Sequence, residues 1–559
     1  MSVNTIVPPN LRISSFAISL SIAAFAHHAG AVEFNIENSD LSVRWDNTVK
    51  YSAGWRLKDR SRALTEGSTA LNQDDGDRNF GKGLISNRLD LLSEFDMSYQ
   101  DFGLRVSGAG WYDTVYQENN DNNAPDRVNA YSVKPNHFTD DTRRLHGGDV
   151  ELLDAFAYWS GDLGEHPTTV RAGQFAQLWG ESLFFGVNGI AGGMAPIDVV
   201  KAVSVPNSQF KELVRPIQQL GGQFQLTPDV LVAAYYQFEW EETRLPGVGS
   251  YFSSSDTLGE GNERLIVGEP FPAFLGGRPD RPAAFYHGKD KKAKDSGQGG
   301  VQVRWSTGDI DWGLYAIQFH EKQAQLLVRP SATPDFASGK IGEYYWVYPE
   351  DVRAFGASFS TTIDTFNLAG EISTRWNQPL ASTNAAALAP DESINNRNDP
   401  NYAVGKTLHA QVSWLGSLGP SFISQEASFV GEVAWNRVMS VTKNPGARDP
   451  NSDRDAMALR MVYEPMYRQI LPGWDVGIPL GVSYANGNSS ALGVGFGQDH
   501  GGDINIGVNA TYLSVWKLGL TYTHYYGPEN TTLDENSHFT YEQSLKDRDF
   551  ISISLSRTF

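Results

Sequence analysis

The chain contains no cysteine, fewer basic than acidic side chains, and little continuous hydrophobicity. The absence of cysteine excludes disulfide scaffolds, thiolate metal sites and cysteine nucleophiles. The 45 basic and 65 acidic side chains give a formal net charge of -20, which argues against a nucleic-acid binder because such proteins need a basic surface to neutralise phosphates. A mean hydropathy of -0.37 argues against a polytopic helical membrane protein, whose spans each need roughly 20 apolar residues.

What the chain has instead is length, glycine and aromatic residues. Its 559 residues include 55 glycines, and 12% of them are aromatic. A soluble protein of this length would ordinarily divide into several domains. High glycine and aromatic content at low mean hydropathy therefore needs another explanation.

The N-terminus has the pattern of a secretory signal peptide. Arg12 precedes an apolar run over 13–26, and Ala29-Gly30-Ala31 follows, which is the order of basic region, apolar region and small-residue cleavage site. The run is too short for a good spanning helix, and an uncleaved anchor is the alternative. We expect residues 1–31 to be cleaved on export and residues 32–559 to form the mature protein.

Alternation of apolar and polar residues with a period of two recurs along the mature chain. Over 41–56 the odd positions are mostly apolar and the even positions mostly polar, which is a strand signal longer than most strands of soluble sheets. The same pattern predicts eighteen strands, at 41–56, 88–99, 102–113, 150–160, 168–179, 219–227, 230–241, 298–306, 310–320, 352–362, 365–376, 405–415, 427–438, 455–465, 474–486, 502–512, 516–527 and 546–559.

The connections between these strands alternate between short and long. Gln100-Asp101 and Pro228-Asp229 are short, whereas 57–86, 114–149 and 242–297 are long. An even strand count with both termini on the short-turn side is typical of a bacterial outer-membrane barrel. We therefore predict an all-β fold, a single closed antiparallel transmembrane β-barrel of about 18 strands with long extracellular loops and short periplasmic turns.

In such a barrel one face of each strand meets lipid and the other meets the lumen. Aromatic residues near strand ends, such as Trp45, Tyr112, Trp240 and Trp312, are predicted to form girdles at the two membrane interfaces. The polar faces bring ten positive and twelve negative side chains into the lumen. This near balance predicts a paired charge lattice with weak charge selectivity, because a selective pore shows a one-sided ring. The pore-lining candidates are Arg44, Lys50, Arg88, Glu94, Arg105, Glu239, Glu371 and Arg460.

The connection over 180–218 is unusually apolar for a loop at an aqueous rim. We expect it to fold into the lumen as a constriction, and packing as an external cap is the alternative. The candidate constriction residues are Phe184, Phe185, Asp198, Lys201, Lys211, Glu212 and Arg215.

Two other connections differ from ordinary surface loops in length or in composition. The largest, 242–297, is predicted to be an extracellular lid loop. The run from Asp74 to Asn79 is rich in aspartate but lacks the glycine placement and terminal glutamate of an EF-hand calcium loop. It is interpreted as an Asx-rich turn, with a bound divalent cation as the minor alternative.

The sequence shows no signature of an enzyme. His320, His409 and His524 are isolated, and no nucleophile elbow or paired-histidine motif is present. We expect no catalytic residue, no metal and no cofactor, although a catalytic triad assembled from distant strands is an alternative.

Six short blocks resemble a known family. They are Trp45-Asp46-Asn47-Thr48, Asp75-Gly76-Asp77-Arg78-Asn79-Phe80, Ser86-Asn87-Arg88-Leu89-Asp90, Gly108-Ala109-Gly110-Trp111-Tyr112-Asp113, Trp179-Gly180-Glu181-Ser182 and Tyr251-Phe252-Ser253-Ser254-Ser255-Asp256. Over essentially the whole mature chain they resemble a proteobacterial outer-membrane family catalogued as a domain of unknown function, number thirteen-oh-two. The resemblance implies a barrel in the Gram-negative outer membrane, in contact with outer-membrane lipid. It also implies two partners, a periplasmic lipoprotein-carrier-like protein and a transporter of the resistance-nodulation-division class.

Taken together, these patterns predict an outer-membrane channel or conduit for a hydrophobic or amphiphilic organic compound or lipid. A general porin for small hydrophilic solutes is the first alternative. An outer-membrane enzyme or adhesin acting at the loop rim is the second.

Overall fold

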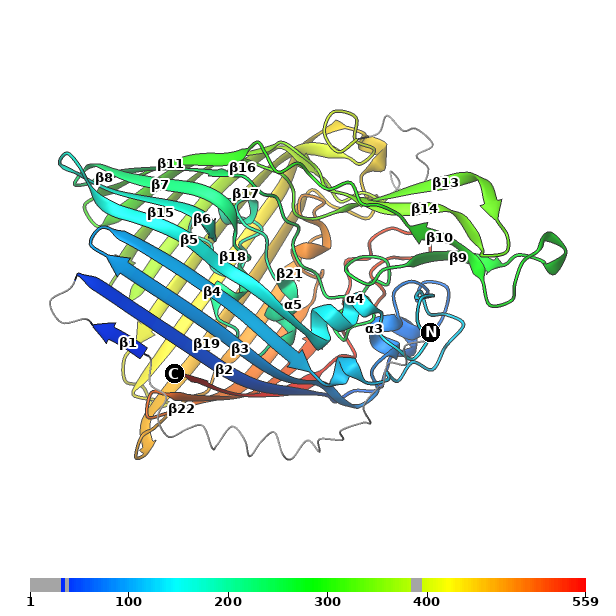
Figure 1. Ribbon diagram of the computed structural model, residues 1–559, viewed down its shortest axis with the longest axis horizontal. Helices are drawn as coiled ribbons and strands as arrows, with labels where there is room; N and C mark the ends of the chain where they lie inside the picture. The colour runs from blue at the N-terminus through cyan, green and yellow to red at the C-terminus, as the bar shows by residue number, and fades with distance from the viewer. Residues whose placement is uncertain (1–31, 36–39, 384–394) are drawn as a thin grey trace, which may run out of the picture.

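The computed structural model describes residues 32–35, 40–383 and 395–559 (Figure 1). The predicted signal peptide, residues 1–31, lies outside these ranges. Among the described residues, no helix is both long enough and apolar enough to cross a membrane.

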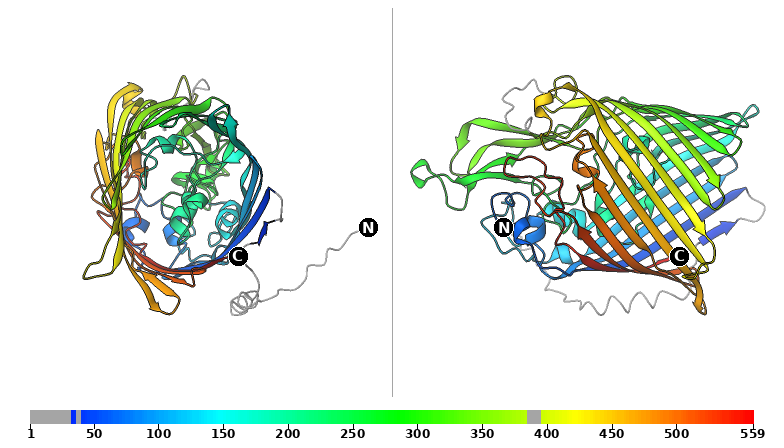
Figure 2. Two further views of the ribbon diagram at one scale, coloured as in Figure 1. Left: turned by 90° about the vertical axis from the view of Figure 1, so that its left-hand side faces the viewer. Right: turned by 180° about the vertical axis from the view of Figure 1, so that it is seen from behind.

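Eighteen antiparallel strands form one closed barrel (Figures 1 and 2), which confirms the predicted fold class. Closure occurs where β24 pairs with β2, from Thr48 opposite Thr558 to Arg56 opposite Phe550. The ring consists of β2 (Leu41–Arg56), β3 (Gly83–Tyr99), β4 (Phe102–Asp113), β5 (Gly148–Leu163), β6 (His166–Phe175), β7 (Ile217–Thr227), β8 (Val230–Gln237), β11 (Gln298–Thr307), β12 (Ile310–Phe319), β15 (Val352–Ile363), β16 (Phe366–Pro379), β17 (Val404–Leu418), β18 (Glu426–Lys443), β19 (Asp455–Leu471), β20 (Trp474–Gly477) continued by β21 (Leu480–Asn486), β22 (Gly502–Tyr512), β23 (Trp516–Tyr526) and β24 (Phe550–Thr558).

The two faces of the wall divide as the alternation predicts. Outward-facing side chains such as Leu91, Leu314 and Val412 are apolar and exposed, whereas the inward-facing Lys50 and Gln411 are buried. An apolar outer face meets lipid without unpaired polar groups, and the polar inner face is covered by other protein groups. The barrel interior is therefore occupied.

Several strand ends differ from the prediction. β6 and β8 end at Phe175 and Gln237, short of 179 and 241, and β24 begins at Phe550 and not at 546. The predicted strand over 474–486 is divided at Ile478-Pro479, because proline lacks the amide hydrogen that continues a ladder. Pro465 of β19 lies beside the break, where Ile478 N donates to Pro465 O at 3.1 Å.

A second sheet stands on the long-loop side of the barrel (Figure 1). Its order is β13-β14-β10-β9, and only the pairing of β10 with β14 is parallel. Its strands are β9 (Arg264–Pro270), β10 (Pro282–His287), β13 (Gln325–Asp335) and β14 (Lys340–Val347). The region predicted as a lid loop, 242–297, thus supplies two strands of a sheet that the next long loop completes.

This sheet explains one error in the predicted aromatic girdle. Trp45, Tyr112 and Trp312 are exposed on the barrel, but Trp240 is only 4% exposed. Trp240 lies beyond the end of β8 and packs against Tyr348 with ring centroids 4.8 Å apart. It belongs to the core of the extracellular loops.

The remaining elements are short. β1 (Val32–Asn35) pairs with β2 beyond the end of β24. The helical turns are α2 (Arg62–Thr65), α3 (Asp75–Arg78), η1 (Val115–Gln117), α4 (Asp140–Thr142), η2 (Arg143–Gly147), η3 (Ile190–Gly193), α5 (Val199–Ser204), α6 (Phe210–Leu213), η4 (Ala273–Leu275), η6 (Pro445–Ala447) and η7 (Gly493–Gly495). η3, α5 and α6 all lie in the connection between β6 and β7.

Candidate functional site

The connection between β6 and β7 lies inside the barrel. We refer to residues 176–216 as the in-folded segment. Seen from the short-turn end, helical and irregular chain fills much of the bore (Figure 2, left), and α5 is visible through the wall in Figure 1. Trp179, Ile190 and Met194 of the segment pack against inward-facing Tyr235 and Tyr315 of β8 and β12.

Carboxylates of the wall bind the backbone of this segment on one side of the bore. Glu371 of β16 accepts hydrogen bonds from Ile190 N at 2.6 Å and Glu181 N at 3.0 Å. Glu432 of β18 accepts from three consecutive amides, those of residues 183–185, with Leu183 N at 3.1 Å. Irregular backbone has no ladder to satisfy its buried N–H groups, so these two carboxylates take that role.

Cations and amides complete the same attachment. Arg375 of β16 donates to Val187 O at 2.6 Å and to Gly189 O at 2.8 Å. Asn188 donates to Gln411 at 3.2 Å and contacts His409 Nδ1 at 3.1 Å. The loop between β12 and β13 adds Lys322, which donates to Gly193 O at 2.9 Å, and burial lowers the pKa of this amine to about 8.

Ion pairs attach the segment to the other side of the bore. Lys201 pairs with Glu151 of β5, and Lys211 pairs with Glu94 of β3, each at 2.5 Å. Glu212 lies 3.7 Å from Lys50 of β2. Strands β2–β5 lie across the ring from β16–β18 in the strand order. The segment therefore spans the bore from wall to wall.

The other predicted constriction residues also make specific contacts inside the barrel or at its rim. Asp198 caps α5 and pairs with Arg244 at 2.8 Å, and Arg215 pairs with Glu241 at 3.5 Å. Phe185 packs against Phe496 with ring centroids 5.7 Å apart, and the ring of Phe184 lies under the guanidinium of Arg460.

The predicted pore-lining charges form a paired lattice where they lie on the wall. Arg105 pairs with Glu94, Asp96 and Asp154 at 2.6–3.1 Å. Three other predicted pore-lining cations also pair within the wall, Arg44 with Asp46 at 2.7 Å, Arg88 with Asp90 at 2.8 Å and Arg460 with Asp503 at 3.3 Å. Glu239 differs, because it follows the end of β8 and accepts from Gln218 N at the rim.

Some of the anchoring groups were not among the candidate residues. Asn188, Gln411 and His409 carry no charge or motif, and nothing in the sequence marks them. Glu432 is one of the twelve acidic side chains that the alternation places in the lumen. Its partners are backbone amides, which no sequence pattern reveals.

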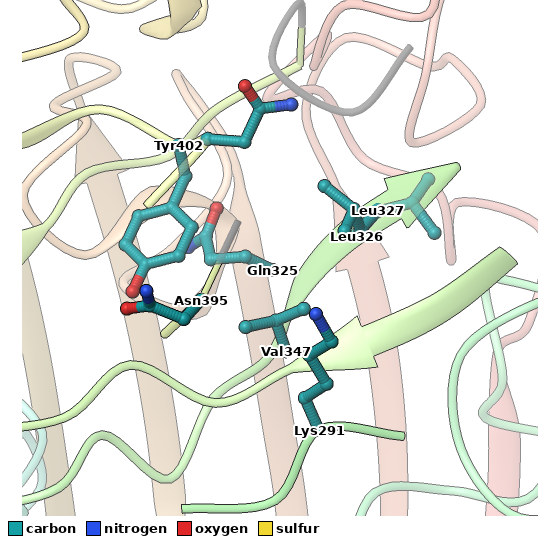
Figure 3. A pocket seen from close by; sticks show the side chains of 8 residues that line it. Lys291, Gln325, Leu326, Leu327, Val347, Asn395 and Tyr402 are labelled. Atoms are coloured by element: carbon teal, nitrogen blue, oxygen red, sulfur yellow. The ribbon is translucent and has the colours of Figure 1, made fainter. Parts of the chain in front are cut away.

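Two cavities in the described part of the chain are water-sized. One, of about 20 Å³, lies between Ser204 at the end of α5 and the loop residues Tyr116 and His146. The other, of about 10 Å³, lies where Tyr402 and Asn395 approach Val347 of β14 (Figure 3). Each holds about one water molecule. An organic solute does not fit either cavity unless the surrounding segments move.

The chain matches one family model and is distantly similar to several solved structures. A family model described as "Protein of unknown function (DUF1302)" matches residues 12–559. No curated protein matches the chain. Among solved structures, OccAB1 of Acinetobacter baumannii has a TM-score of 0.43 at 9% identity, covering 95% of this chain and 99% of that one. OpdK of Pseudomonas aeruginosa has a TM-score of 0.39 at 10% identity, covering 92% and 98%. Likeness at this distance transfers neither substrate nor mechanism.

Replacing Glu432 by Ala is expected to loosen the in-folded segment. Three amides lose their acceptor, and a hydrogen bond to a charged group contributes about 1.5–3 kcal/mol. Hydrogen–deuterium exchange at residues 183–185 should therefore accelerate by about tenfold or more. The matched control is Glu426→Ala on the same strand, since Glu426 pairs with the exposed Arg468 instead of the segment. Equal exchange in both variants would show that Glu432 does not hold the segment.

Proposed function

The chain belongs to the DUF1302 family of proteins of unknown function, and from that membership and its closed barrel we propose that it is an outer-membrane channel for a hydrophobic or amphiphilic organic compound or lipid. The in-folded segment is the constriction of this channel. The protein acts in the Gram-negative outer membrane after loss of residues 1–31.

The observation that carries the proposal is the apolar surface that the segment leaves uncovered in the bore. Leu183, Phe184, Val203 and Phe210 remain exposed, and Phe210 is 65% exposed. When an apolar solute covers an exposed apolar side chain, the contact stabilises the complex by roughly 25 cal/mol for each Å² of apolar surface removed from water. Small ions gain no such free energy from these groups.

The charges beside these apolar groups favour an amphiphile over a purely apolar solute. Arg460 lies over the ring of Phe184, and Lys211 follows Phe210 on α6. Both cations already have carboxylate partners, in Asp503 and Glu94. A solute with an apolar body and a polar head would meet apolar side chains and exchangeable ion pairs at the same depth.

The way the segment is attached favours a constricted channel and argues against a permanently open pore. Its backbone is bound to β16 and β18 on one side, and its lysines are bound to β3 and β5 on the other. A general porin keeps an aqueous channel through its lumen. Here passage of an organic solute requires some of these bonds to break.

Deleting residues 188–205 is expected to open the channel. In planar bilayers the single-channel conductance should rise several-fold, because the deletion removes α5 and its bond to Glu151. The double variant Glu371→Gln, Glu432→Gln is a milder test that keeps the chain length. Unchanged conductance in both would show that the segment does not limit flux.

Replacing Phe184 and Phe210 by Ala tests the substrate class. Entry of a fluorescent long-chain carboxylate into proteoliposomes should fall, whereas swelling in small sugars should stay the same or rise. The matched control is Phe355→Ala, which removes an exposed ring from the lipid-facing side of β15. If both solutes respond equally to the Phe184 and Phe210 change, the channel is a general porin.

We further propose that a periplasmic lipoprotein-carrier-like protein, and beyond it a resistance-nodulation-division transporter, exchanges the solute at the short-turn end. Turn residues there are apolar and exposed, with Phe422 98% exposed, and exposed apolar side chains favour contact with a partner or membrane. A photo-cross-linking residue at 422 should capture a periplasmic carrier in cells. The same residue at Phe274, exposed on the extracellular side, is the control. Capture from neither position, or from both, would contradict this docking.

A further inference from the structure

Three buried aspartates meet where the extracellular loops cover the barrel mouth. Asp74 and Asp75 belong to the loop after β2, and Asp256 belongs to the loop after β8. Their side chains are buried, and one oxygen from each lies within 4.8 Å of one oxygen of each of the others. The two loops fit closely here, because a Cβ on Gly76 would lie 2.5 Å from Ser253 O.

The hydrogen bonds of this cluster leave two carboxylate oxygens without partners. Asp256 Oδ2 accepts from Asp74 N at 3.0 Å and from Asp75 N at 3.3 Å. Asp74 Oδ2 accepts from Arg78 at 2.6 Å and from Arg127 at 3.3 Å. Asp74 Oδ1 and Asp256 Oδ1 are buried with no hydrogen-bond partner. A buried, unpaired carboxylate oxygen is costly.

A buried asparagine contacts the same cluster. Asn129 is fully buried, and its backbone N–H donates to Asp75 Oδ2 at 3.1 Å. Its side-chain nitrogen donates to Asn72 Oδ1 at 2.6 Å and to Arg264 O at 2.8 Å. Two acceptors facing that nitrogen fix the orientation of the amide. The remaining Asn129 Oδ1 is buried and has no partner.

The positive charges near the cluster reach only one of its three carboxylates. Arg78 and Arg127 both pair with Asp74. In the described part of the chain, no Lys, Arg or His nitrogen lies within ion-pair distance of Asp75 or Asp256. Buried like charges this close repel strongly unless a cation or a proton separates them.

The only other carboxylate cluster of this kind in the described residues is fully paired. His320 accepts from Asp351 N at 3.0 Å and contacts Ser296 O at 2.9 Å, so both its ring nitrogens are engaged. Lys294 pairs with Glu350 at 3.4 Å, and Arg397 pairs with Asp351 at 2.5 Å. This cluster needs no further cation and serves as a comparison.

We propose that Asp74, Asp75 and Asp256, with Asn129 Oδ1, bind a divalent cation, and that the cation is Ca²⁺. The donors are all oxygens, which suit a hard cation. Two oxygens that each lie about 2.4 Å from one Ca²⁺ are at most about 4.8 Å apart. Mg²⁺ demands near-ideal octahedral geometry, whereas the flexible coordination of Ca²⁺ suits carboxylates that come from separate loops.

The bound cation would join three extracellular loops. Asp74 and Asp75 lie in the loop after β2, Asn129 in the loop after β4 and Asp256 in the loop after β8. No helix or strand holds these loops to one another at this point. Bound Ca²⁺ would thus cross-link the three loops and hold them over the barrel mouth.

Calcium binding is measured directly on the full-length barrel in detergent. Isothermal titration of chelator-treated protein with Ca²⁺ should show one site per chain, and Ca²⁺ should raise the melting temperature. Asp256→Asn should weaken binding by about tenfold or more, because it removes one ligand charge. Asp75→Asn is the second variant, in case the first does not fold.

The control is Glu350→Gln in the paired cluster, which should leave Ca²⁺ affinity unchanged. The competing occupant is a proton, since burial and the charge of Asp74 raise the pKa of Asp75 to about 7. No heat of binding and no thermal shift in wild type would overturn the proposal in favour of that proton. Equal loss of affinity in Glu350→Gln and Asp256→Asn would also overturn it. Neither result depends on whether the channel conducts.

Discussion

Backbone N–H and C=O groups must find hydrogen-bond partners wherever water is excluded, and this constraint shapes the molecule at two levels. In the wall it requires a closed ring, because an open strand edge in lipid would leave such groups unpaired. Inside the ring it acts on the in-folded segment, whose backbone between residues 181 and 190 belongs to no strand. Glu371, Glu432 and Arg375 satisfy that segment from the wall. The inner surface of the barrel thus serves as the hydrogen-bonding partner of its own constriction.

Charged side chains that face the bore form ion pairs with the in-folded segment. Lys50 and Glu94, on the wall, reach Glu212 and Lys211 of the segment. Near balance of positive and negative charge follows from this pairing and says little about the charge of the solute. The uncovered apolar side chains of the segment are the part of the bore that remains free to interact with a solute.

The sequence predicted the ring well because each strand carries a two-residue period that lipid enforces on one face. The same period predicted that Glu94, Arg105 and Glu371, which lie on regular strands, face inward. It failed where the chain leaves the ladder. Trp240 continues the alternation of β8 by two residues but belongs to a loop core, since periodicity does not reveal where pairing stops. Asn188 and the amides of 183–185 could not be found, because their role depends on contacts with strands more than 180 residues away. The run from Asp74 to Asn79 drew notice in the sequence, with a bound divalent cation as the minor alternative, but Asp256 could not be joined to it because it lies far from Asp75 in sequence.

The seam between β24 and β2 has a consequence for the order of assembly. It joins residues near the two ends of the mature chain, such as Thr48 and Thr558, so the ring cannot shut until the last strand has been delivered. Contacts over so long a sequence separation form slowly. The in-folded segment bonds to β3 and to β18, on opposite sides of the ring. Because these partners lie on opposite sides of the ring, the attachment of the segment is complete only when both sides of the wall are in place.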